Sequence, residues 1–104
     1  MRRAALLLAT AAAALAFAAP ATAAVTRTDA RAIARADGRD FVRTYFRTEG
    51  SYSLLGCRRD PGRWTCDLDA TSEAGIYCSW RLWIAPVRGG SHAQGRTHVD
   101  CQRA

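Results

Sequence analysis

The chain has 104 residues, with 15 basic and nine acidic side chains and a formal net charge of +6 at pH 7. This length leaves room for one small domain and excludes a multidomain protein. Every basic residue is arginine, and such an excess of positive charge favours anionic surfaces without selecting a partner.

Residues 1–23 are predicted to be a signal peptide that is cut off on export. Two arginines at the N-terminus and an apolar run rich in Ala and Leu precede Pro20. Small residues that match the cleavage rule of signal peptidase follow it. Cleavage is expected after Ala23, with Ala24 as the alternative. The apolar run is shorter than the ~20 residues that a membrane-spanning helix needs. We therefore expect a secreted protein whose single domain is residues 24–104.

The first element of this domain is predicted to be a helix over residues 28–48. Thr28 or Asp29 can cap its start, because their side-chain oxygens accept hydrogen bonds from the free N–H groups of the first turn. Gly38 costs about 1 kcal/mol relative to Ala in a helix, which makes it a candidate for a kink or break. Gly50 is expected to end the helix. The apolar residues that recur at helical spacing are Ala30, Ile33, Ala34, Phe41, Val42, Tyr45 and Phe46.

After Gly50 the hydrophobic period changes to two, which predicts four strands joined by turns. The turn signals are Asp60-Pro61-Gly62, the segment 71–75 and Gly89-Gly90. The predicted strands are residues 51–58, 63–71, 75–86 and 96–103.

All four cysteines lie in the predicted domain, and an even count in a short exported chain implies disulfides. Cys57 and Cys66 lie four residues on either side of the Pro61-Gly62 turn. Cys78 and Cys101 lie eleven residues on either side of the last turn. Opposed strand residues have Cβ atoms ~4.5–5.5 Å apart, close to the separation that a disulfide spans. The turns therefore favour Cys57–Cys66 and Cys78–Cys101 over the other two connectivities.

Strand alternation places the cysteines and a nearly complete set of apolar side chains on one face of the sheet, which the helix can cover. The expected fold class is α+β: one N-terminal helix packed on a four-stranded antiparallel β-meander, stapled by two disulfides. Pro86 cannot donate a ladder hydrogen bond, so residues 85–95 are expected to open into a loop or to hold a bulge. The predicted inward side chains are Ile33, Phe41, Val42 and Tyr45 from the helix and Leu55, Trp64, Leu68, Ala70, Ile76, Trp80, Leu82, Ile84 and Val99 from the strands.

Arginine recurs every four residues along the predicted helix, which forms a ridge of like charges. Such neighbours repel by a few tenths of a kcal/mol per pair, and Asp37 and Asp40 offset only part of this. The ridge is a candidate surface for an anionic partner: lipid headgroups, a cell-wall polymer, nucleic acid or an acidic protein. The alternative is a solvated helix face without a partner. Its arginines would then reflect codon usage, because the composition resembles that of proteins from GC-rich bacterial genomes. Its members are Arg27, Arg31, Arg35, Arg39, Arg43 and Arg47, and Arg58, Arg59 and Arg63 are predicted to extend it.

The other face of the predicted sheet mixes aromatic and charged side chains. Rigid rings give contact area at low entropic cost, so such mixtures can mark binding surfaces. Tyr77, Arg81 and Trp83 are the candidate binding residues on this face. The alternative is a face that is simply exposed or that the 85–95 loop covers. The predicted members are Tyr52, Leu54, Thr65, Asp67, Asp69, Tyr77, Ser79, Arg81, Trp83, His98 and Asp100.

The sequence carries no motif for catalysis, a metal or a cofactor. Ser79, His98 and Asp100 can be drawn as a triad, and Asp67 with Asp69 as a carboxylate pair. Residues two apart on a strand, however, lie side by side without converging. The cysteines are separated by 8, 11 and 22 residues, without the C-x-x-C pairs of zinc sites. We therefore expect no enzyme activity, no metal and no cofactor.

The expected function is that of a secreted, non-catalytic binding module that recognises an extracellular protein, as an inhibitor or an adaptor. The alternative is an electrostatic binder of anionic envelope polymers, lipids or nucleic acid through the arginine-rich helix face. A steep loss of affinity with rising salt would distinguish the second from the first.

Overall fold

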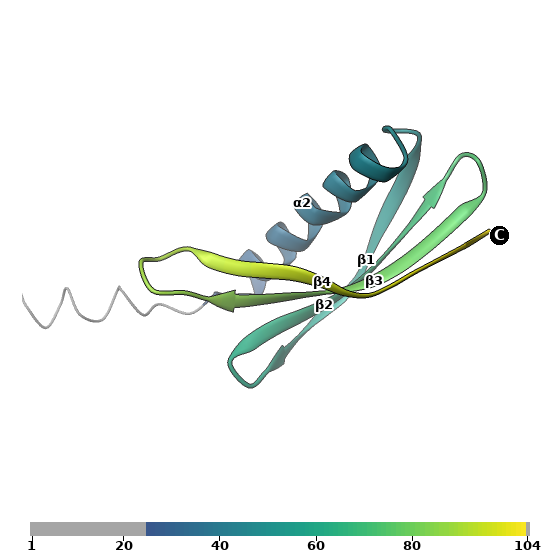
Figure 1. The fold of residues 1–104 in the computed structure, drawn as a ribbon. Coiled ribbons are helices and arrows are strands. Elements are labelled where there is room, and N and C mark those ends of the chain that lie inside the picture. Colours follow the sequence, from purple (N-terminus) through teal and green to yellow (C-terminus); the bar gives the residue numbers. More distant parts are fainter. Residues whose placement is uncertain (1–24, 104) are drawn as a thin grey trace, which may run out of the picture.

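The computed structural model describes residues 25–103 as one helix packed on a four-stranded antiparallel sheet (Figure 1). The strands lie in sequence order, so β1 and β4 form the two edges. The predicted α+β meander is confirmed, whereas the predicted signal peptide, residues 1–23, lies outside the described residues. The elements are α2 (Arg27–Tyr45), β1 (Gly50–Asp60), β2 (Arg63–Ser72), β3 (Ile76–Pro86) and β4 (His92–Arg103).

Helix α2 begins with a capping box, and its cap is neither of the two residues predicted from the sequence. The cap is Thr26, whose Oγ1 accepts a hydrogen bond from the backbone N–H of Asp29 at 3.1 Å. The Asp29 carboxylate accepts one in return from the N–H of Thr26, also at 3.1 Å. These hydrogen bonds lower the pKa of Asp29, because they favour its charged form. The cap is therefore neither Thr28 nor Asp29, since Asp29 is the third helical residue and closes the box from inside.

The helix ends at Tyr45 rather than at residue 48, because the chain turns left-handed just beyond it. Phe46 caps the end and donates its N–H to Val42 O at 2.9 Å. Arg47 and Thr48 follow with φ angles of 52° and 68°, which a helix cannot contain. Gly38 causes no break, since α2 is continuous through it.

The first hairpin turns at Pro61-Gly62, and the predicted Cys57–Cys66 pair faces across it and is bonded. A β-bulge between Leu54 and Gly56 then shifts the register by one residue. A shift of one residue exchanges the two faces of a strand. Tyr52 and Leu54, predicted on the outer face, therefore face the helix and pack against the core. Leu55, predicted inward, is 64% exposed.

The last hairpin, β3–β4, departs from the predicted register in two places, and the two changes cancel. Its loop is residues 87–91, because Pro86 pairs with His92. β3 ends at Pro86 as predicted, but β4 begins at His92 rather than at residue 96, so the opening expected over residues 85–95 is shorter than predicted. This loop changes the register by one residue from that of a two-residue Gly89-Gly90 turn. A bulge opposite Ser79 and Arg81 then restores the predicted register. The predicted Cys78–Cys101 disulfide is confirmed.

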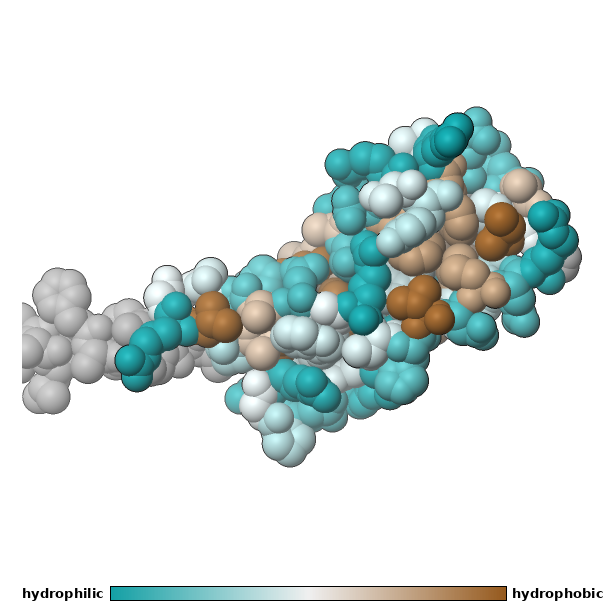
Figure 2. Space-filling model, viewed as in Figure 1, coloured by the Kyte–Doolittle hydropathy of each residue, from teal (hydrophilic) through white to brown (hydrophobic). Residues whose placement is uncertain are grey.

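The core lies between α2 and the inner face of the sheet, and the helix packs mainly on β1 and β2. Besides Leu55, two more inward predictions are wrong, since Tyr45 is 61% exposed and Val99 is 52% exposed. Helix α2 packs mainly on β1 and β2 rather than on β4, where Val99 lies. The Tyr45 ring lies against Phe41 of its own helix, with ring centroids 4.7 Å apart. Figure 2 shows hydrophobic side chains at the surface among hydrophilic ones. The buried apolar residues are Ala30, Ala34, Phe41, Val42, Phe46, Trp64, Cys66, Leu68, Ala70, Cys78, Trp80, Leu82 and Ile84.

A buried ion pair joins the helix to β4. The Asp37 side chain is only 7% exposed and lies 3.0 Å from Arg96 Nη2. Trp80 Nε1 donates to Asp37 Oδ2 at 2.9 Å, and the Arg96 guanidinium lies 5.1 Å from the ring centre of Phe41. Arg96 also reaches Asp40 at 3.3 Å. The charges of Asp37 and Arg96 therefore compensate each other where water is largely excluded, whereas the Asp40 side chain is 59% exposed.

Candidate functional site

The outer face of the sheet is open to solvent because α2 covers only the other face (Figure 1). Alternation along the strands places Tyr77, Arg81 and Trp83 on this face, as predicted. The outer face further carries Ser51, Ser53, Arg58, Arg63, Thr65, Asp67, Asp69, Thr71, Ser79, Gly95, Thr97 and Asp100.

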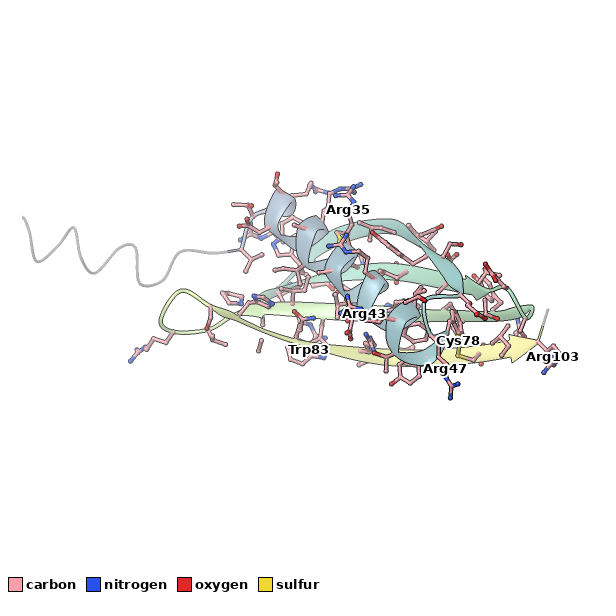
Figure 3. All side chains as sticks on the ribbon, turned by 90° about the horizontal axis from the view of Figure 1, so that it is seen from above. Arg35, Arg43, Arg47, Cys78, Trp83 and Arg103 are labelled. Atoms are coloured by element: carbon pink, nitrogen blue, oxygen red, sulfur yellow. A yellow bond between two sulfur atoms is a disulfide. The ribbon has the colours of Figure 1, made fainter. Side chains whose placement is uncertain are left out.

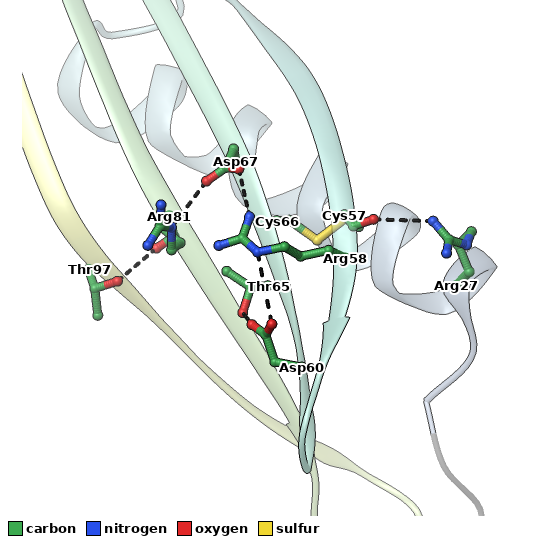
Figure 4. Close-up of polar contacts among 9 residues, drawn as sticks. All are labelled: Arg27, Cys57, Arg58, Asp60, Thr65, Cys66, Asp67, Arg81 and Thr97. Atoms are coloured by element: carbon green, nitrogen blue, oxygen red, sulfur yellow. Dashed lines mark hydrogen bonds and ion pairs between the residues drawn. A yellow bond between two sulfur atoms is a disulfide. The ribbon is translucent and has the colours of Figure 1, made fainter.

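At its centre, Asp67 joins two arginines from neighbouring strands (Figure 4). Arg58 Nη1 lies 2.9 Å from Asp67 Oδ2, and Arg81 Nε lies 3.2 Å from Oδ1. The hydroxyl of Thr65, only 3% exposed, donates to Asp60. These pairs fix the long arginine side chains, so less entropy is lost when a partner binds them.

The two aromatic side chains of the outer face are also held in place. A Cβ on Gly95 would lie 2.8 Å from Trp83 Nε1, so the indole ring lies against the bare backbone of β4. Tyr77 Oη donates to Asp69 Oδ2 at 3.3 Å. The negative charge of Asp69, burial and this hydrogen bond raise the pKa of the Tyr77 hydroxyl above its ordinary value.

The bulge in β4 directs His98 towards a shallow hollow on the outer face. His98 has a φ of 54°, which is uncommon for a residue other than glycine. The hollow has a volume of about 220 Å³, and Trp83, Arg81 and His98 are among the side chains that line it. Bulges commonly redirect a side chain next to a functional surface. Strand alternation predicted His98 on this face, but no local pattern in the sequence indicated the hollow.

The drawn triad is not assembled in the part of the chain that the structure describes. Ser79 pairs directly with Asp100 across the strands, but no hydrogen bond joins either to His98 within residues 25–103. His98 Nδ1 lies 3.1 Å from Thr97 Oγ1 instead. Asp67 and Asp69 each have a partner of their own. Within the same residues, no group of three His, Cys, Asp or Glu side chains could hold a metal ion.

The helix arginines form a second charged surface (Figure 3). Arg35 and Arg43 project from α2, whereas Arg47 lies beyond its end in the left-handed conformation. Arg27 differs from the rest, because it donates to Cys57 O at 3.2 Å and lies over the Trp64 ring. Within residues 25–103, no ion pair joins Arg31, Arg35, Arg39, Arg43 or Arg47 to a carboxylate.

Among the described residues, these arginines lack acidic partners because the two nearby aspartates of α2 contact a different arginine. Asp37 and Asp40, expected to offset the arginines, both contact Arg96 on the other side of the helix. The signal was present in the sequence, because Asp37 interrupts the apolar stripe of Ala30, Ala34 and Phe41. An acid at such a position requires a buried partner.

No family model, curated protein or solved structure matches the chain. In residues 25–103, no helix is long and apolar enough to cross a membrane. The two disulfides indicate folding in an oxidising compartment. The fold and the two surfaces thus define a small disulfide-bonded α+β domain with an open sheet face and an arginine-rich helix flank.

Proposed function

We propose that the protein is a secreted, non-catalytic binding module that recognises an extracellular protein through the outer face of its sheet. Export by the leader at residues 1–23 would deliver it to the oxidising compartment that its disulfides require. Trp83, Tyr77 and Arg81 are the proposed centre of the contact.

The composition of the outer face carries this proposal. Serine, threonine, glycine, three aspartates and Arg63 surround one tryptophan, one tyrosine and the two paired arginines, Arg58 and Arg81. Binding surfaces of antibodies use the same mixture, in which small residues adapt and rigid aromatic or arginine side chains supply most of the energy.

The size of the face is also suitable. Four strands of about ten residues span ~19 Å by ~33 Å, from the usual strand spacing and rise. This approaches the ~800 Å² that each partner contributes to a standard interface. Because disulfides and side-chain pairs fix the face before binding, an inhibitor or adaptor role is compatible with it.

The test is a capture experiment with matched baits. The oxidised protein, a Trp83→Ala/Tyr77→Ala variant and an Arg35→Gln/Arg39→Gln/Arg43→Gln variant are incubated with culture supernatant and cell envelope. We expect a protein retained by the first and third baits and bound more than tenfold more weakly by the second. Arg81→Ala, which leaves the Trp83–Gly95 contact intact, should weaken binding as well. Retention by the outer-face variant with loss in the arginine variant would contradict the proposal.

A second function is favoured by the unpaired helix arginines, namely electrostatic binding of an anionic envelope polymer. Poly(glycerol phosphate) is a suitable probe, because it is a polymer of phosphate groups. The affinity of the protein for it should fall steeply as the salt concentration rises. Removing Arg35, Arg39 and Arg43 together should reduce the slope of log K against log salt by about two to three. An unchanged slope would exclude these arginines as the contact.

A further inference from the structure

A groove lies between the second half of α2 and the start of the edge strand β1. It has a volume of about 430 Å³, a size that suits a small organic ligand. Apolar and basic groups both line it. They include Arg39, Val42 and Arg43 from the helix and Thr48, Ser51 and Tyr52 from the loop and strand.

Gly38 seats Tyr52 in the wall of this groove. A Cβ on Gly38 would lie 2.7 Å from Tyr52 Cγ and 2.9 Å from its Cε2, so only glycine lets the ring approach the helix. Glycine is otherwise unfavourable in a helix interior. Its presence here is explained by the position that it gives to the tyrosine.

This seat brings the Tyr52 hydroxyl to Arg39. Arg39 Nη1 lies 3.5 Å from Tyr52 Oη and donates to it, so the proton of that hydroxyl remains available for a ligand. Arg43 lies one turn further along the same flank, where Cβ atoms are ~5–6 Å apart. Neither arginine has a carboxylate partner within residues 25–103.

We propose that this groove binds a soluble phosphate ester that carries a small apolar body. Arg39, Arg43 and the Tyr52 hydroxyl supply three donor groups, and a phosphate monoester presents three terminal oxygens. A carboxylate has only two. Val42 and the Tyr52 ring provide apolar surface for the body of the ligand. The site does not rest on the outer face of the sheet, so its failure would leave the proposed function unaffected.

The ligand class can be tested by NMR titration of the oxidised protein with phenyl phosphate. We expect saturable shifts at Val42, Ser51 and Tyr52, with weaker binding of benzoate, inorganic phosphate and benzyl alcohol. Tighter binding of benzoate than of phenyl phosphate, or equal binding of all four, would overturn the proposal.

Three variants test the residues. Arg39→Gln and Arg43→Gln should each weaken the binding of phenyl phosphate about tenfold. Tyr52→Phe, which keeps the ring but removes the hydroxyl, should weaken this binding about threefold. Arg35→Gln is the matched control, because it removes the same charge one turn earlier and does not line the groove. It should change the affinity less than twofold. An equal effect of Arg35→Gln would mean that only the net charge of the helix matters and would overturn the site.

Vesicles distinguish a soluble ester from a lipid headgroup. We expect the wild-type protein and the Arg39→Gln variant to bind phosphatidylglycerol vesicles equally tightly. Vesicle binding that Arg39→Gln abolishes, without saturable binding of phenyl phosphate, would contradict the choice of a soluble ligand.

Discussion

The β1–β2 hairpin and the strand β4 belong to one sheet, yet the helix packs mainly on the first. On β2, alternate side chains are buried beneath α2, whereas most of β4 is exposed on both faces. β4 is held by its ladder to β3, by the Cys78–Cys101 disulfide and by the contacts of Arg96 with the helix.

The difference shows how a domain of this size extends a sheet beyond the reach of its helix. Apolar burial contributes about 25 cal/mol per Å², and β4 has little surface to bury. Covalent and ionic cross-links replace that burial, so the two regions should respond differently to the loss of a single interaction.

The largest effect is expected from Arg96→Gln. This substitution leaves Asp37 buried without its cation and should lower the free energy of unfolding by about 3–4 kcal/mol, measured by urea denaturation. Arg58→Gln removes a pair whose side chains are 47% and 40% exposed, and it should cost less than about 1 kcal/mol. Similar losses in the two variants would show that the ion pair does not hold β4.

The next effect concerns the two disulfides. The Cys78–Cys101 bond spans 23 residues of sequence and the Cys57–Cys66 bond spans nine. Chain entropy then predicts losses of about 3.5 and about 2.5 kcal/mol for the respective double alanine variants.

Hydrogen exchange sharpens this prediction. Without Cys78–Cys101, the amides of β4 should lose protection before those of β2. Without Cys57–Cys66, the hairpin should stay protected at its helix-covered residues. The same exchange pattern in both variants would contradict the division into packed and cross-linked regions.

A smaller effect is expected from Gly38→Ala in the packed region. The new Cβ would overlap the Tyr52 ring and cost about 1–3 kcal/mol, although alanine is the better helix former. Gly56→Ala is the control, because a Cβ there meets nothing within 4 Å. Thermal unfolding of both variants is the measurement, and a stabilised Gly38→Ala variant would show that Tyr52 does not need this seat.

A small effect is also expected at the helix start. Thr26→Ala should cost about 1 kcal/mol by removing the cap. The lowered pKa of Asp29 adds a pH dependence. Its contribution is fully present above the ordinary value of 3.8 and is lost as the pH falls through the lowered folded value. A melting temperature that depends on pH equally in wild type and Asp29→Asn would contradict this.

The sequence predicted the helix, the strands and both disulfides because turn residues and cysteines are local signals. The sequence could not predict the bulge at Leu55, because no particular residue type marks such a bulge. The bulge moved Tyr52 and Leu54 from the predicted outer face to the inner face. The Cys78–Cys101 pairing was predicted from a two-residue turn at Gly89-Gly90. The actual loop is longer, and the two cysteines face each other only because the bulge in β4 shifts the register back by one residue.

The candidate site was predicted in a similar way. Tyr77, Arg81 and Trp83 lie on the outer face because alternation within β3 is undisturbed. The Asp37–Arg96 pair joins residues 59 apart in sequence. It therefore depends on how the helix lies across the sheet, which local patterns do not specify. The groove beside Tyr52 depends on that same packing.

Peptide mapping of the unreduced protein tests the central claim most directly, which is that two cross-strand disulfides fix the sheet. Cleavage after arginine and glutamate separates the four cysteines, since Glu73 lies between Cys66 and Cys78. We predict that residues 50–58 remain linked to residues 64–73 and that residues 74–81 remain linked to residues 97–103. A link between residues 50–58 and 74–81, or four free thiols, would contradict the account.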